Sequence, residues 1–157
     1  MIYFKNVKLT AFFLWIIIAI WLMLIFSLSA QPASNSNGLS EQVTAGLIQF
    51  IATIGGTDIQ GKEWMGLVYQ YNHFVRKGAH AFIYFILGVL IVATERKSGI
   101  KGYKVYVLAV SFCFLYAATD EFHQTFIVGR GGKLSDVLLD TSGAIGGMIV
   151  YSLLNIR

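Results

Sequence analysis

The chain alternates long apolar segments with short polar ones, and the lengths of the apolar segments predict its architecture. Apolar residues dominate over about 9–30, 74–94, 103–119 and 135–154. A helix rises about 1.5 Å per residue, so about 20 residues cross a hydrocarbon core of roughly 30 Å. We therefore expect one domain over residues 1–157, an all-α membrane bundle with four transmembrane helices.

A short additional helix is expected between the first two spans. Residues 31–38 are rich in Ser, Asn, Pro and Gly, a composition typical of a linker. Ser40 can then cap a helix over residues 40–54, where apolar residues recur at helical spacing. Because this segment is too short and too polar to span, we expect an amphipathic helix in the first extracytoplasmic loop. It would lie on the membrane surface or on the top of the bundle.

The composition supports a membrane protein and argues against two other classes. Hydrophobic residues make up 56% of the chain and charged residues 13%, against about 45–50% and 25% in soluble domains. The net charge is +4, but no basic run with interleaved aromatic residues predicts a nucleic-acid partner. Cys113 is the one cysteine, which excludes an intramolecular disulfide.

The positions of the basic residues predict the orientation in the membrane. Short cytoplasmic segments carry an excess of Lys and Arg. One side of the predicted bundle holds most of these residues, namely Lys5, Lys8, Arg96, Lys97, Lys101, Lys104 and Arg157. The other side holds all three histidines and every acid except Glu95. We expect a multi-pass protein of the cell membrane with both termini cytoplasmic, an uncleaved first span and an extracytoplasmic polar site.

The second span begins with side chains suited to an anion. Lys77, His80 and Tyr84 follow spacings of three and four, which place them on one helical face. Arg76 lies on the same face, four residues before His80. Basic residues near a helix end commonly extend to the lipid headgroups, and this is the preferred interpretation of Arg76.

The end of the third span carries Asp120, Glu121, His123 and Gln124. A charged group in hydrocarbon costs about 2.5–3.5 kcal/mol on insertion scales, so these residues mark a site. Asp120 and His123 also match the carboxylate-x-x-His pairs of metal-binding bundles. Because a second such pair is missing, we expect no metal and no cofactor. The glycine-rich turn that follows is expected to place Arg130 over the site.

The fourth span presents two carboxylates and two glycines on one stripe. Asp136, Asp140, Gly143 and Gly147 are separated by four, three and four residues. The glycines allow a neighbouring helix to approach closely, so the carboxylates should face that helix. Asp136 could instead cap the helix, together with Ser135.

These segments combine into one predicted ligand site. Its expected residues are Lys77, His80, Tyr84, Asp120, Glu121, Gln124, Arg130, Asp136 and Asp140. The alternative is a set of ion pairs that only holds the helices together.

The same motifs carry a resemblance to a known family. The sequence reads Lys77-x-x-His80-x-x-x-Tyr84, then Asp120-Glu121-x-x-Gln124 with Gly129-Arg130, then Asp136-x-x-x-Asp140-x-x-Gly143-x-x-x-Gly147. It resembles the VanZ-like family of small bacterial membrane proteins, named for the accessory teicoplanin-resistance protein. Val128 stands where this family often has proline, and Asp140 where it often has asparagine. The resemblance implies a multi-helix protein of the bacterial envelope.

Three functions follow from these observations. The first is a non-enzymatic envelope protein whose pocket binds an anionic head group or a lipoglycopeptide and contributes to teicoplanin resistance. Its partners would be membrane lipids or a lipid-linked envelope precursor. The second is a membrane hydrolase acting on such a precursor, with His80 or His123 and one of Asp120, Glu121 or Asp136 as acid and base. No Gly-x-Ser-x-Gly or His-Glu-x-x-His motif supports it.

The third is a structural or assembly subunit, in which Gly143 and Gly147 face a partner or a second copy.

Overall fold

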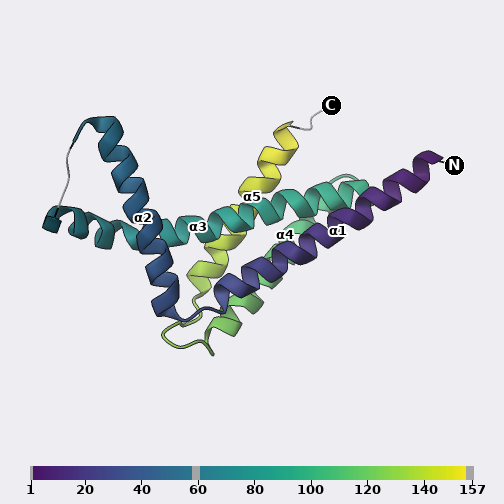
Figure 1. The fold of residues 1–157 in the computed structure, drawn as a ribbon. Helices are drawn as coiled ribbons and strands as arrows, with labels where there is room; N and C mark the ends of the chain where they lie inside the picture. Colours follow the sequence, from purple (N-terminus) through teal and green to yellow (C-terminus); the bar gives the residue numbers. More distant parts are fainter. Residues whose placement is uncertain (1, 58–60, 155–157) are drawn as a thin grey trace.

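The computed structural model describes residues 2–57 and 61–154, with side chains from residue 9 onward. This part of the chain is all-helical apart from short connections (Figure 1). Its helices are α1 (Ile2–Ser29), α2 (Ala33–Gly55), α3 (Gly61–Lys97), α4 (Lys104–Gln124) and α5 (Leu134–Leu154). The side chains of Lys5 and Lys8, and all of Arg157, which entered the orientation argument, lie outside the described residues.

Four of these helices, α1, α3, α4 and α5, are long and apolar enough to cross a membrane. The prediction of four spans is therefore confirmed at the level of helix length and composition. The helix α5 begins within one residue of the expected boundary, whereas α4 continues beyond residue 119 to Gln124.

The second span was predicted to begin at about residue 74, but the helix that contains it begins earlier. The helix α3 begins at Gly61, so Lys77 and His80 lie near its middle and not in its first two turns. The predicted start of the span marked the residue where the apolar run begins. Helical hydrogen bonding continues through the more polar residues before it, and Val68 from this part is buried.

The predicted linker and the predicted cap of α2 are also wrong. Residues 33–38 are helical, and Pro32 precedes them with φ −54° and ψ 151°. Proline suits a helix start because its fixed φ and missing N–H cost nothing there. Ser40 lies inside the helix, is buried, and donates to the Asn37 carbonyl at 3.0 Å.

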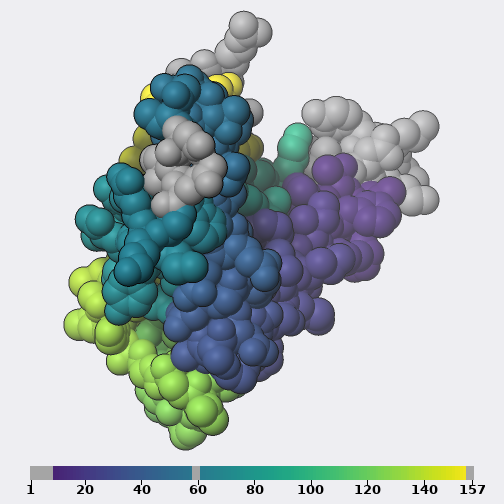
Figure 2. Space-filling model, turned by 60° about the vertical axis from the view of Figure 1, so that its left-hand side comes forward, coloured from purple at the N-terminus to yellow at the C-terminus, as the bar shows by residue number. Residues whose placement is uncertain are grey.

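The helix α2 is longer than the amphipathic helix expected in the loop, and it packs along the first part of α3. Figure 2 shows it between α3 and α1, with the α4–α5 connection beside its first turns. Its tertiary role is to form one wall at this end of the bundle.

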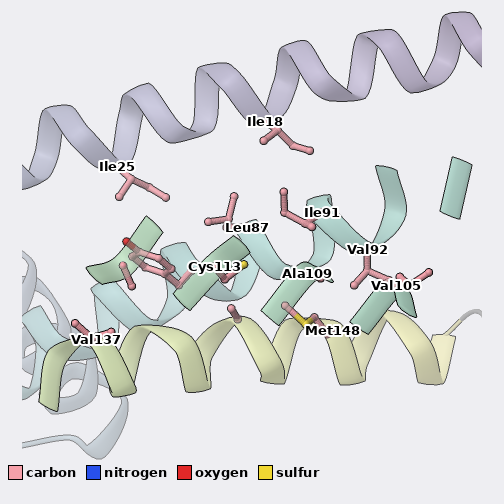
Figure 3. Packing of buried hydrophobic residues seen from close by; sticks show 13 residues of the cluster. Ile18, Ile25, Leu87, Ile91, Val92, Val105, Ala109, Cys113, Val137 and Met148 are labelled. Carbon is pink, nitrogen blue, oxygen red and sulfur yellow. The ribbon is translucent and has the colours of Figure 1, made fainter. Parts of the chain in front are cut away.

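The central element is α3, which contacts each of the other four described helices. The apolar core combines Ile18 and Ile25 of α1 with Leu87 and Ile91 of α3 (Figure 3). Small residues of α4, Ala109 among them, complete the centre and are fully buried. Polar contacts add to this packing: Trp21 Nε1 donates to the Ile83 carbonyl at 3.1 Å, and Tyr116 Oη to the Leu22 carbonyl at 2.6 Å.

The tightest crossing is that of α3 and α5. A Cβ atom added at Gly88, Gly143 or Gly147 would overlap a backbone carbonyl oxygen of the facing helix. The two backbones are therefore in direct contact, as in small-xxx-small helix pairs. Because α3 of the same chain occupies this glycine stripe, the stripe is not available to a partner chain.

Candidate functional site

A polar cavity of about 160 Å³ lies at one end of the bundle. At this end α1 and α4 end and α2 and α5 begin (Figure 1). It is lined mainly by charged and polar side chains from α3, α4, α5 and the α4–α5 connection. Those side chains are His73, Arg76, Lys77, His80, Glu121, Gln124, Arg130, Lys133, Asp136 and Asp140.

The basic wall comes from one face of α3. Arg76, Lys77 and His80 share it because residues three and four apart are neighbours on a helix. Lys77 forms an ion pair with Asp136 of α5, and the two side chains are 30% and 28% exposed. Arg76 donates a hydrogen bond to the Asn37 side chain of α2. These contacts join three helices around the cavity.

Arg130 reaches the same cavity from the connection between α4 and α5. Gly129 before it has φ +75°, a conformation that side chains other than glycine rarely adopt. The amide of Ala33 donates to the Val128 carbonyl at 3.2 Å, which attaches this connection to the start of α2. Burial and the nearby Arg76 lower the pKa of Arg130, yet arginine stays protonated in proteins. No carboxylate among the described residues lies within ion-pair distance of it.

The acidic wall is built from Glu121, Asp136 and Asp140. Glu121 Oε2 accepts a hydrogen bond from the Lys133 amide at 2.8 Å, which closes the connection onto α4. Asp140, one turn deeper than Asp136, is 2% exposed, and its Oδ1 has no hydrogen-bond partner among the described residues. The cavity thus has one paired carboxylate near its opening and one unpaired carboxylate at its base.

Seven of the nine predicted ligand residues line this cavity, and Tyr84 and Asp120 do not. Tyr84 is fully buried, with its ring 6.3 Å from that of Tyr116. Asp120 is 4% exposed, and its oxygens have no hydrogen bond of ordinary geometry in the described chain. For Asp120 the orientation of α4 is the reason, because it directs Glu121 toward the cavity and Asp120 toward Ser29 of α1.

His123, a candidate acid or base, also lies outside the cavity. Its ring contacts that of Phe26, with centroids 4.7 Å apart. Gln124 instead both lines the cavity and donates to Ser29 Oγ of α1 at 2.7 Å. Across residues 2–57 and 61–154, no group of three or more His, Cys, Asp or Glu residues is arranged to hold a metal ion.

Three of the charged and polar side chains that line the cavity were not among the predicted ligand set, namely His73, Arg76 and Lys133. Arg76, for which extension to the lipid headgroups was the preferred interpretation, donates to the Asn37 side chain and lines the cavity. His73 precedes Lys77 by four residues and His80 by seven, so helical spacing was a usable signal. Lys133 lies in a connection, where no periodicity applies.

A protein-family model described as VanZ/LLP1 matches residues 13–155. The chain belongs to this family. The VanZ/LLP1 match covers nearly the whole chain and includes every residue that lines the cavity. No curated protein and no solved structure gives a significant match. The VanZ/LLP1 assignment and the four apolar helices together indicate a membrane protein.

Proposed function

We propose that this protein is a non-enzymatic protein of the bacterial envelope whose cavity binds an anionic group. The supporting observation is the gathering of Arg76, Lys77, His80, Arg130 and Lys133 around one cavity, where Lys77 has the one ion pair found in the described chain. Charge-assisted hydrogen bonds to phosphate or carboxylate are the strong ones. The planar guanidinium fork of Arg130 suits both groups.

The size of the cavity limits what enters it. At about 160 Å³, it is smaller than the roughly 300–1,000 Å³ of typical pockets for drug-sized ligands. A phosphate or carboxylate head group fits, whereas a whole glycopeptide does not. The ligands we propose are a membrane lipid, a lipid-linked envelope precursor or the anionic part of a lipoglycopeptide.

We further propose that the cavity faces the extracytoplasmic side. The last turn of α3 carries Arg96 and Lys97, and the connection to α4 carries Lys101, all at the opposite end of the bundle, which favours a cytoplasmic location for that end. A cavity on the outside meets envelope precursors and lipoglycopeptides. Lower susceptibility to teicoplanin is the cellular phenotype that this role predicts.

A second candidate function is hydrolysis of a lipid-linked precursor. The observation in its favour is that His80 lines the same cavity as Glu121, Asp136 and Asp140, which brings an imidazole and carboxylates into reach of one ligand. Release of phosphate or of a sugar from an envelope lipid by the purified protein would support this function over simple binding.

The deciding experiment is native mass spectrometry of the detergent-purified protein titrated with dodecyl phosphate. We expect Arg130→Gln to weaken binding by about tenfold or more, since a hydrogen bond to a charged group contributes about 1.5–3 kcal/mol. Lys101→Gln, an exposed position in the α3–α4 connection, is the matched control and should bind like the wild type.

Neutral dodecyl maltoside tests whether charge is recognised, and it should not compete with dodecyl phosphate. Equal binding of dodecyl phosphate by the wild type, Arg130→Gln and Lys101→Gln would contradict the proposal. The same spectra report the oligomeric state, and a homo-oligomer remains a prediction that they test.

A further inference from the structure

A second cavity, mainly apolar, lies directly beside the polar one. It is also about 160 Å³ and lies between the end of α1, the start of α2 and the middle of α3. Its apolar lining includes Ile25, Leu28, Val43 and Ile83. We call this cavity the apolar groove.

The groove and the polar cavity share two residues. Arg76 and His80 line both of them. On α3 the groove continues from these residues along Val75, Ala79 and Ile83, which recur every fourth residue on one stripe. From Val75 to Ile83 this stripe is roughly 12 Å long. It leads from the charged end of the bundle into the apolar part of α3.

We propose that the ligand of the polar cavity is a lipid whose hydrocarbon chain occupies the apolar groove. This inference rests on the proposed function, because it places the anionic head group of that lipid among Arg76, His80 and Arg130. Charge complementarity selects the head group, and the two lining residues that the adjacent cavities share favour a molecule with both parts. A free phosphate would fill the polar cavity and leave the groove without a role.

The test distinguishes the contribution of the lipid's hydrocarbon chain to binding from the contribution of its head group. Native mass spectrometry is used to titrate the full-length protein with dodecyl phosphate and, separately, with inorganic phosphate. Ala79→Phe fills the groove with a ring while every polar side chain of the neighbouring cavity is kept. Ala79 is exposed in the described chain, so the fold has room for the larger residue. The matched control is Ala19→Phe, an exposed position of α1 that lines neither cavity.

We expect Ala79→Phe to weaken dodecyl phosphate binding by about tenfold, because several methylene groups lose their apolar contacts. Ala19→Phe should bind like the wild type, which removes any effect of the detergent micelle on the comparison. Inorganic phosphate should bind equally to all three proteins. If Ala79→Phe does not fold, Val43→Trp fills the groove from α2 and should give the same loss.

Two results would overturn the inference in distinguishable ways. If dodecyl phosphate binds all groove variants like the wild type but still requires Arg130, the groove is irrelevant and the proposed function stands. If its binding requires neither Arg130 nor an open groove, the proposed function fails together with the inference.

Discussion

At the scale of single residues, the carboxylates of Asp120 and Asp136 have different environments. Asp136 pairs with Lys77 at the opening of the cavity. Asp120 is 4% exposed and its oxygens have no hydrogen bond of ordinary geometry in the described chain. A buried polar group without a partner costs stability, whereas removal of one member of a pair leaves the other uncompensated. The two residues should therefore respond in opposite directions to loss of charge.

We expect Asp120→Asn to leave the free energy of unfolding unchanged or to raise it, because a neutral amide costs less to bury than a carboxylate. Asp136→Asn should lower it by about 1 kcal/mol, since Lys77 loses its partner in a partly exposed pair. Unfolding by SDS in mixed micelles, followed by tryptophan fluorescence, measures both variants. A large loss of stability in Asp120→Asn would show that this carboxylate has a partner beyond the described contacts.

At the scale of elements, the crossing of α3 and α5 positions the site. The contact places Lys77 of α3 beside Asp136 of α5. It depends on the lack of side chains at Gly143 and Gly147, where a Cβ atom would overlap the carbonyl oxygens of Ala81 and Phe85. Between membrane helices such close packing replaces the hydrophobic driving force that acts in water. The geometry of the cavity is thus linked to two glycines outside it.

We expect Gly147→Ala to destabilise the protein by about 1–3 kcal/mol, because the added methyl group forces the two backbones apart. The neighbouring Gly146→Ala is the control: its Cβ atom would lie 3.6 Å from the Phe85 ring, an ordinary contact. Its stability should be unchanged or slightly higher, since alanine favours a helix over glycine by about 1 kcal/mol. SDS unfolding compares the two variants, and equal losses would contradict the close-packing argument.

At the scale of the whole molecule, the described helices place two connections at opposite ends. The α4–α5 connection contributes Arg130 to the cavity, and the basic α3–α4 connection lies at the other end of the bundle (Figure 1). Because α4 is one span between them, the two connections should lie on opposite sides of a membrane. The basic end is expected inside the cell.

Single cysteines test this topology in a Cys113→Ala background. Gly131→Cys should react with a membrane-impermeant maleimide on intact cells, whereas Ser98→Cys should react only after lysis. Both positions are exposed, and a Cβ atom at Gly131 meets no other atom within 4 Å. Labelling of Ser98→Cys but not of Gly131→Cys on intact cells would reverse the proposed orientation. Labelling of both would contradict the span between them.

The sequence by itself determined the class of protein and the composition of the site. The length of an apolar run and the helical spacing of its residues are local properties, so the spans and the glycine stripe of Gly143 and Gly147 were readable from residue order. The rarity of charge in hydrocarbon was enough to select the segments that line the cavity. The family was recognisable for the same reason, because its motifs consist of these unusual residues.

Only the tertiary structure decided which of these residues meet. The rotation of α4 separates Glu121 from Asp120 and His123, and the packing of α3 buries Tyr84. The composition of residues 33–38 predicted a linker, whereas in the structure these residues are helical and Asn37 accepts a hydrogen bond from Arg76 of α3. The apolar groove also exists only because α1, α2 and α3 leave space between them. The physical reason is that contacts between segments distant in sequence decide which side chains face one another and where cavities form. The periodicity of a segment describes only that segment.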